Sequence, residues 1–351
     1  MKTLVKIVLP LLLIGNLVSC KDHVLYDTKP GATGRAYDVM VIMPDSLWNG
    51  PAGDTLKSIL TENPMILNQA EPLYTVYQAD AGKITNLLYR HRNIVLFQVG
   101  RHEQPSMTIE YDVYSKPQAV VRITGPSSQV VTDYMDVHRF ALQEIFDMAE
   151  RDRTAKAVTQ FVDTDIRKKV RDEFGVSINI PRGYTIRSEH PDFIWISYET
   201  PVISQGVVIY KYPLSGRSDF TVPSLVERRN EFMSLIPGWN KGSYMQTAEI
   251  FTPMLSLTSI NNRMWLKLTG LWDLNGGFMG GPFTSYSTAN TTTNEMVTVD
   301  LYVYSPKHPK RNYVKYLEGI MHTSRIVGDT TGTLRWEELV QVPLDDIPVE
   351  E

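Results

Sequence analysis

The chain has 351 residues, and at about 100 to 200 residues per domain this length suggests two folded units. Hydrophobic residues make up 42% and charged residues 21%, which excludes a wholly disordered or low-complexity chain. A formal net charge of -4 argues against a dedicated nucleic-acid-binding protein with a broad basic face. The single cysteine excludes a framework of disulfide bonds.

The first residues have the pattern of a secretory signal. Lys2 and Lys6 supply the positive start, and the apolar stretch from Ile7 to Ile14 follows. This stretch is shorter than the roughly 20 residues that a membrane-spanning helix needs, so we expect the segment to be cleaved. We assign residues 1–19 to a lipoprotein signal peptide.

The residues from Leu17 to Cys20 (LVSC) are typical of a bacterial lipobox, in which the cysteine thiol is joined to diacylglycerol. The alternative is an ordinary signal peptide whose cysteine keeps a free thiol. Acylation is favoured because Cys20, the only cysteine, stands at the one position where lipidation consumes it. The sequence therefore predicts a partner in the lipid bilayer, reached through acylated Cys20, and a location in the cell envelope at the outer membrane. It leaves open which face of the membrane carries the protein.

Residues 20–35 contain Pro30, Gly31 and Gly34 without a periodic apolar pattern, and we expect a flexible tether there. Residues 36–180 then alternate between strand and helix patterns, which predicts an N-terminal α/β lobe. We expect strands over 37–43, 73–78, 93–99 and 110–124, and helices over 53–62, 83–90, 127–148 and 154–174.

After Pro181 the strands cluster, which predicts a second lobe over residues 181–327 with an antiparallel sheet and packed helices. We expect strands over 184–187, 193–198, 207–212, 247–260, 264–274 and 297–304, and helices over 222–235 and 311–324. Residues 328–351 are acidic and are expected to form a loosely held tail. The predicted fold class is α+β, with two α/β lobes whose mixed or antiparallel sheets pack against helices.

Motifs of common enzymes do not occur. No two of the seven histidines stand four residues apart, so a helical zinc site of the His-Glu-x-x-His type is absent from the sequence. The Gly-x-Ser-x-Gly string of a nucleophile elbow is missing as well. We therefore predict no metal site and no cofactor, and the sequence identifies no catalytic residue.

The densest group of unusual residues runs from Gly270 to Tyr286 (GLWDLNGGFMGGPFTSY). The glycines give the backbone freedom, but no Lys-Ser or Lys-Thr pair follows, so a phosphate loop is not indicated. We interpret the segment as a long hairpin connection. Its apolar side chains either form an exposed recognition surface or are buried and cap the sheet. The candidates for such a surface are Trp272, Phe278, Met279, Phe283 and Tyr286.

A second glycine-rich loop with aromatic residues spans Ile236 to Met245 (IPGWNKGSYM). Trp239 and Tyr244 lie in it after a predicted helix, where their rings are able to stack on a sugar or a peptide. The alternative is that they seal the edge of the core.

Several strings resemble those of an uncharacterised family of Bacteroidota envelope lipoproteins that contain a domain of unknown function. They are HRNIVLF (91–97), SKPQAVV (115–121), IPGWNKGSYM (236–245), GLWDLNGGFMGGPFTSY (270–286) and YVYSPKHPKRNYVKYLE (302–318). This resemblance implies the envelope of a Gram-negative cell and implies no catalytic residue. The second half is also faintly similar to the PsbP and Mog1 sandwich, an analogy of element order that does not license a function.

The leading hypothesis from the sequence is a membrane-tethered, non-enzymatic binding or assembly protein that uses loop aromatics to contact an envelope protein or glycan. One alternative is a hydrolase of envelope glycans or peptides in which Asp273 or Glu295, near the same loop, acts as the acid. Another is a purely structural component of the envelope.

Overall fold

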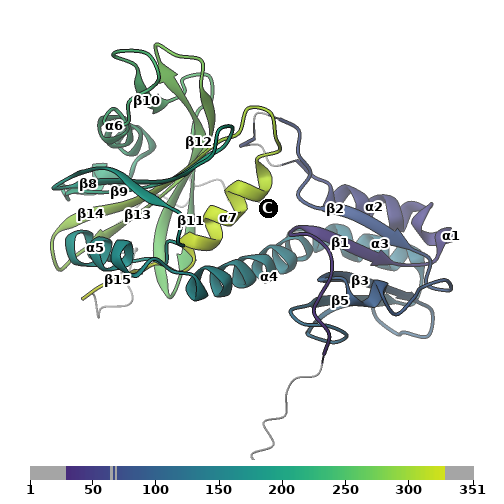
Figure 1. Cartoon of the computed structure of the whole chain (residues 1–351). Coiled ribbons are helices and arrows are strands. Elements are labelled where there is room, and N and C mark those ends of the chain that lie inside the picture. The colour runs from purple at the N-terminus through teal and green to yellow at the C-terminus, as the bar shows by residue number, and fades with distance from the viewer. Residues whose placement is uncertain (1–28, 64–65, 68, 329–351) are drawn as a thin grey trace, which may run out of the picture.

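The computed structural model describes residues 29–63, 66–67 and 69–328. The predicted signal peptide, Cys20 and the acidic residues after Gly328 lie outside the described residues. Two domains follow each other along the chain, and a long helix lies between them (Figure 1). The predicted α+β class, with sheets packed against helices, is confirmed.

The N-terminal domain contains a five-stranded sheet in the order β2-β1-β3-β5-β4. Strands β2, β1, β3 and β5 run parallel to one another, and β4 is antiparallel to β5. Its strands are β1 (Asp38–Ile42), β2 (Thr75–Ala79), β3 (Asn93–Val99), β4 (Ser106–Tyr111) and β5 (Ala119–Gly125). Its helices are α1 (Asp45–Trp48), α2 (Pro51–Leu60), α3 (Ser128–Val137) and α4 (Arg139–Gln160).

All five residues of β1 are buried, as expected for a central strand whose two faces are both covered. Val39 and Val41 pack with α2, α3 and α4 on one face of the sheet. Met40 and Ile42 belong to a smaller cluster on the other face. The continuous apolar run in the sequence is therefore explained by burial on both sides.

The C-terminal domain is built on an antiparallel sheet in the order β10-β12-β13-β14-β9-β8-β7, with β11 also paired to β12. Its longer strands are β7 (Thr185–His190), β8 (Phe193–Glu199), β9 (Ser204–Pro213), β10 (Tyr244–Thr247), β11 (Met254–Ile260), β12 (Arg263–Asn275), β13 (Gly280–Asn290) and β14 (Glu295–Tyr304). Its helices are α5 (Thr164–Phe174), α6 (Val222–Met233) and α7 (Arg311–Met321), and the short strands β6 (Val176–Ser177) and β15 (Arg325–Ile326) pair with each other.

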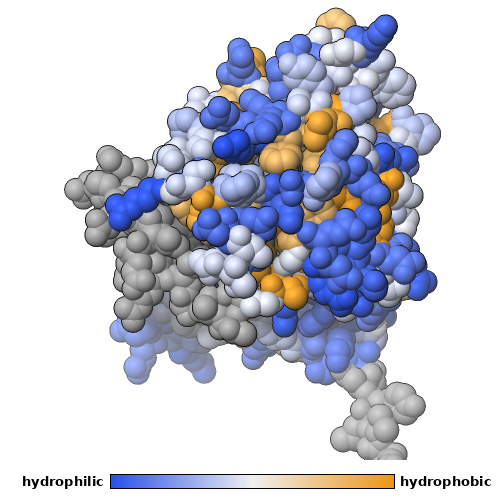
Figure 2. All heavy atoms as spheres, turned by 90° about the vertical axis from the view of Figure 1, so that its left-hand side faces the viewer, coloured by the Kyte–Doolittle hydropathy of each residue, from blue (hydrophilic) through white to orange (hydrophobic). Residues whose placement is uncertain are grey.

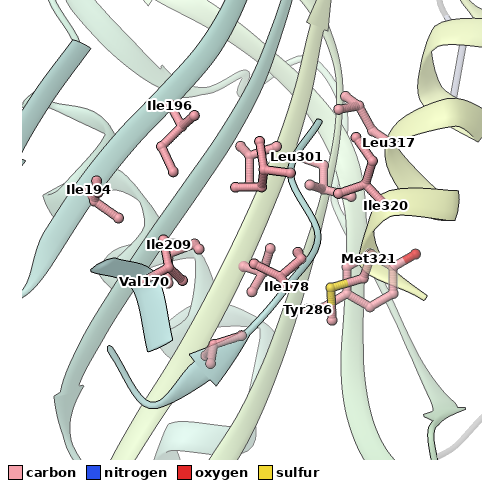
Figure 3. Packing of buried hydrophobic residues seen from close by; sticks show 14 of the residues in the cluster. Val170, Ile178, Ile194, Ile196, Ile209, Tyr286, Leu301, Leu317, Ile320 and Met321 are labelled. Carbon is pink, nitrogen blue, oxygen red and sulfur yellow. The ribbon is translucent and has the colours of Figure 1, made fainter. Parts of the chain in front are cut away.

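Two cores cover the two faces of this sheet. On one face, Ile194, Ile196 and Ile209 lie opposite Leu317 and Ile320 of α7, together with residues of α5 (Figure 3). The other core contains residues of α6 packed against β8, β9, β12 and β13. The antiparallel sheet with helices packed on it agrees with the expectation for this half of the chain.

Helix α4 contributes to both domains. Leu142 and Phe146 belong to the core of the N-terminal domain, whereas Val158, near the end of α4, belongs to the core of the C-terminal domain. α4 also packs along α7, so the two domains share a helix pair (Figure 1).

A carboxylate of the N-terminal domain holds the first turn of α7. Both oxygens of Glu71 accept the backbone N–H of Lys310 at 2.8 Å, and Oε2 also accepts that of Arg311 at 2.8 Å. Glu71 is buried. The unpaired N–H groups and the positive end of the helix dipole are thus satisfied from the other domain.

Several local predictions differ from the structure. The expected helix over 83–90 is only a single 3-10 turn, Leu88–Arg90. The helical conformation is interrupted at His138, between α3 and α4. Because α4 continues to Gln160, the expected helix over 154–174 is divided into the end of α4 and the separate helix α5. Val170 and Phe174 of α5 lie in the C-terminal core, which places the boundary before α5 rather than at residue 181.

The predicted tether is wrong for its described part. The backbone N–H of Ala32 donates to the carbonyl of Lys116, that of Thr33 donates to Arg90, and that of Arg92 donates to Thr33. Residues 31–33 therefore extend the N-terminal domain, because their backbone is bonded to its loops.

The largest error concerns the glycine-rich segment after Trp272. The expected long connection is limited to a tight turn at residues 276–279, and residues 280–290 form β13, which is paired on both sides with β12 and β14. Ten of its eleven residues are buried.

Replacing Glu71 by alanine is expected to lower the free energy of unfolding by about 1–3 kcal/mol, because buried N–H groups of α7 lose their acceptor. Urea denaturation of the full chain measures this difference. Glu103→Ala, at an exposed position of the same domain, is the control and should change the value by less than about 0.5 kcal/mol. Equal effects of the two substitutions would contradict the role of Glu71.

Candidate functional site

Two loops meet at one end of the C-terminal sheet. One is the α6–β10 loop at residues 237–243, and the other is the β12–β13 turn at residues 276–279. The side-chain amide of Asn240 donates to the carbonyl oxygen of Gly276 at 3.1 Å and joins them. These are the two segments that the sequence singled out, and the structure brings them together.

Each loop presents one aromatic side chain to solvent. Phe278 is fully exposed at the tip of the turn, and 87% of Trp239 is exposed. We call these two residues the aromatic pair. A single exposed apolar side chain is ordinary, but two aromatic rings on adjoining loops offer contact area that the fold itself does not use.

The backbone holds the turn in a defined shape. The N–H of Gly277 donates to the carbonyl of Leu274 at 3.1 Å, and the N–H of Leu274 donates to Met279 at 3.1 Å. Gly276 has a φ of +76°, which a side chain at this position would strain. Phe278 is therefore displayed by a constrained turn rather than by a long loop.

Tyr244 and Met279 lie at the base of the two loops. The amide of Asn275 donates to the Tyr244 hydroxyl at 3.2 Å, and Tyr244 is only partly exposed. Met279 is partly buried against the core next to α6. For these two residues, the alternative of sealing the core edge fits better than that of a free surface.

Trp272, Phe283 and Tyr286 are buried, so their expected place on a recognition surface is wrong. The Trp272 indole N–H donates to the carbonyl of Val303 at 3.2 Å. The Tyr286 hydroxyl donates to Glu318 at 3.4 Å. These side chains face inward because β12 and β13 are central strands covered on both faces.

Phe283 lies under a buried ion pair. The guanidinium of Arg229 is 3.6 Å from the centre of the Phe283 ring, and its Nε donates to Asp300 at 2.8 Å. Ser285 donates to the same carboxylate, and Thr247 accepts from Arg229 at 2.9 Å. The partners of this cluster are satisfied inside the core, and the cluster is inaccessible to a substrate.

The carboxylates proposed for a hydrolase do not come together at the loops. Glu295 begins β14 at the opposite end of β13 from Phe278, and its carboxylate is 3.5 Å from the Nζ of Lys211. Asp273 is on β12 opposite Gly280, close to the turn. The expectation that both carboxylates lie near one loop is therefore wrong for Glu295.

A cavity of about 450 Å³ lies where the domains join. Tyr37, Tyr74 and Phe140 supply aromatic walls, and Asp147 and Lys315 supply charges. Clefts between domains are frequent ligand sites, but the charges here are engaged. The Lys315 ammonium is 2.9 Å from Asp147 and 3.1 Å from Glu318, so it links α4 to α7.

Electrostatic shifts at this junction follow from burial and pairing. Burial alone raises the pKa of Glu318, but the ammonium groups of Lys267 and Lys315 outweigh it and hold that pKa well below its usual range. Burial opposes the charge of Lys315, yet the carboxylates of Glu318 and Asp147 raise its pKa. Burial lowers the pKa of His322 to about 4, so the imidazole is neutral at pH 7.

This junction between α4 and α7 was not predicted from the sequence. The i,i+4 spacing of Asp147 and Arg151 and the i,i+3 spacing of Lys315 and Glu318 were the available signals. Such spacing is common on solvated helix faces, and only tertiary packing shows that α4 and α7 turn these faces toward each other.

No group of three or more His, Cys, Asp or Glu side chains suited to a metal ion occurs within the described ranges. In the same part of the chain, no helix combines the length and hydropathy needed to cross a bilayer. Figure 2 shows a face of the molecule on which hydrophobic side chains gather in small groups among hydrophilic ones.

The fold and its loops define a two-domain α+β protein with a mixed sheet followed by an antiparallel sheet. Residues 163–323 match the family model described as a domain of unknown function (DUF4837), and residues 32–159 match that of another domain of unknown function (DUF8532). The two matches follow each other along the chain without overlap. The gap between the matches falls at the α4–α5 connection, in agreement with the division of the cores.

Two solved structures illustrate weak structural likenesses. The Ran-binding protein Mog1p of Saccharomyces cerevisiae has a TM-score of 0.29 and 13% identity, covering 46% of this chain and 94% of that chain. LpqN of Mycobacterium tuberculosis, described as involved in cell envelope biogenesis, has a TM-score of 0.27 and 11% identity, covering 43% and 83%. The faint likeness to Mog1 agrees with the expectation from the sequence. No curated protein matches the chain.

The lowered pKa of His322 gives a prediction for the pH dependence of stability. The unfolded chain takes up a proton near pH 6.5, and the folded chain does so only near pH 4. The free energy of unfolding should therefore fall as the pH decreases from about 6.5 to 4. His322→Gln should remove about 2–2.5 kcal/mol of the fall between pH 7 and 4.5, measured by urea denaturation. The exposed His102→Gln control should leave the fall unchanged, and an unchanged slope in His322→Gln would contradict the assignment.

Proposed function

We propose that the protein is a membrane-tethered, non-enzymatic binding or assembly protein of the cell envelope, and that the aromatic pair contacts its partner. The observation that carries the proposal is the exposure of Trp239 and Phe278 on two loops joined by the Asn240–Gly276 hydrogen bond. Aromatic side chains supply large contact areas at a low cost in conformational entropy, which is why they dominate many binding surfaces.

The loops are pre-organised, which also favours binding. The turn that carries Phe278 is closed by two backbone hydrogen bonds. Gly242 in the neighbouring loop has a φ of +82°, and Ser243 next to it is buried and donates to the carbonyl of Asn240 at 2.7 Å. A partner that meets an ordered surface loses less free energy in ordering it.

The orientation of the chain supports a partner away from the anchoring membrane. In Figure 1 the described chain begins at the lower side of the N-terminal domain, whereas the β10 and β12 ends that carry the aromatic pair lie at the top of the other domain. The nine chain steps from Cys20 to Lys29 reach at most about 30 Å when fully extended. With Cys20 acylated, this arrangement allows the aromatic pair to lie on the side of the protein away from the lipid. The proposed location is the outer membrane, and the proposed partner is an envelope protein or glycan.

Lipid attachment is tested by replacing Cys20 with serine. The wild-type protein should be recovered in the membrane fraction, with Cys20 as its first residue and a lipid mass on it, because several acyl chains give stable anchoring. Cys20→Ser should lose the lipid mass and leave the membrane fraction. An unmodified Cys20 thiol in the membrane-bound wild type would contradict the anchor.

The role of the aromatic pair is tested by a Trp239→Ala, Phe278→Ala double variant in crosslinked pull-downs from intact envelopes. We expect recovery of the partner to fall at least about tenfold, the effect of losing a binding hot spot. The free energy of unfolding should change by less than about 0.5 kcal/mol, because neither side chain is buried. Sedimentation with insoluble envelope glycan distinguishes a glycan from a protein partner.

The matched control is Leu87→Ala, Tyr111→Ala, which removes two exposed apolar side chains from the N-terminal domain. This control should leave recovery at the wild-type level. If the aromatic-pair variant recovers the same partners in equal amounts, the proposed surface is wrong.

A further inference from the structure

A second cavity, of about 330 Å³, lies at the other end of the C-terminal sheet from the aromatic pair. The β11–β12 turn forms one wall, and the connection from α7 to β15 forms the other. The lining residues are Ile260, Asn261, Asn262, Arg263, Trp265, Ser324, Arg325 and Ile326.

The walls of this cavity are fixed in position. Asn261 and Asn262 have φ values of +50° and +63°, as the two central residues of a tight hairpin turn require. The Asn261 amide donates to the carbonyls of His322 and Ser324 at 3.0 and 2.8 Å. The turn is therefore bound to the end of α7, and the cavity is an open pocket between two segments whose positions are fixed.

Two buried polar atoms of the lining have no hydrogen-bond partner. They are the indole N–H of Trp265 and the hydroxyl of Ser324, in residues with 0% and 1% exposure. The indole N–H can only donate, and a hydroxyl can donate as well. Buried donors without an acceptor cost free energy and are rare in folded proteins. An acceptor from outside the described residues would supply the missing hydrogen bond to both donors.

The charge at the cavity favours an anionic acceptor. Arg325 is exposed at its rim and forms no ion pair with a carboxylate in the described part of the chain. Within the described part of the chain no acidic residue lines the cavity, and the guanidinium of Arg263 donates to Thr288 and to the carbonyl of Ala289. Ile260 and Ile326 supply apolar walls beside these donors. An oxygen anion attached to an apolar body fits this combination better than a cation or a neutral sugar.

We propose that this cavity binds a carboxylate group carried by a small organic body, with Trp265, Ser324 and Arg325 as its hydrogen-bond donors. The carboxylate has two sources: a separate ligand, or the seven acidic side chains that follow Gly328 in the sequence. Both sources have the same chemistry, and the experiment distinguishes them.

The test uses the full-length chain labelled with ¹⁵N at its six tryptophans. Benzoate is the probe, and benzamide, which has the same shape without the charge, is the control ligand. Benzoate should shift the Trp265 indole signal in a saturable way, because this N–H gains a charged acceptor. Trp265→Phe assigns the signal by removing it, and Ser324→Ala is a second variant that removes one donor without enlarging a side chain.

Arg325→Gln should weaken benzoate binding by about tenfold to a hundredfold, the usual effect of losing a charge-assisted hydrogen bond. Arg101→Gln, at an exposed position of the N-terminal domain, should leave it unchanged. Replacing the acidic residues after Gly328 by their amides leaves the benzoate affinity unchanged if a separate ligand is the source. The same replacement raises the affinity if these residues compete for the cavity.

The proposal is overturned if benzoate gives no saturable shift of the Trp265 signal, which would leave water as the occupant. It is also overturned if benzamide binds as well as benzoate, or if Arg325→Gln and Arg101→Gln have equal affinities. Loss of binding in Ser324→Ala with an unchanged free energy of unfolding supports the proposal, since that variant then remains folded.

Discussion

The packing of α4 against α7 is the contact on which the arrangement of the two domains depends. Glu71 satisfies the first N–H groups of α7, and Lys315 lies between carboxylates of α4 and α7. Burying such charges is favourable only when each finds a partner of opposite sign, and the Lys315–Asp147 pair joins α7 to the part of α4 that lies in the N-terminal domain. The interface is therefore specified by complementary charges in addition to apolar contacts.

The sequence predicts the class of each domain well because the spacing of apolar residues along the chain indicates which side chains are buried. The strand at Asn93–Val99 has the expected bounds, and the buried run around Val39 and Val41 is a strand as expected. The helix break at His138 follows no such pattern, since the apolar spacing continues through it. The bonded backbone of residues 31–33 was missed because loop hydrogen bonds leave no periodic signal in the sequence.

The candidate site could be predicted only in part. Trp239 and Phe278 stood out as loop aromatics, and both are exposed. Phe283 and Tyr286 also follow a glycine-rich stretch in the sequence, yet they lie in a central strand. The glycines and the proline at the start of this strand hid its strand pattern. Trp272 alternates with Leu274 and Leu268 on one strand face, and this period of two was the available sign of burial. The joining of the loops through Asn240 depends on tertiary structure and has no counterpart in the sequence.

The 22-residue α4 is a continuous rod with one end in each hydrophobic core. At 1.5 Å per residue, it is about 33 Å long. A helix of this kind bends very little, and its partner α7 lies along it. The separation of the two cores is therefore set by the helix itself, because no loop interrupts it between residues 139 and 160.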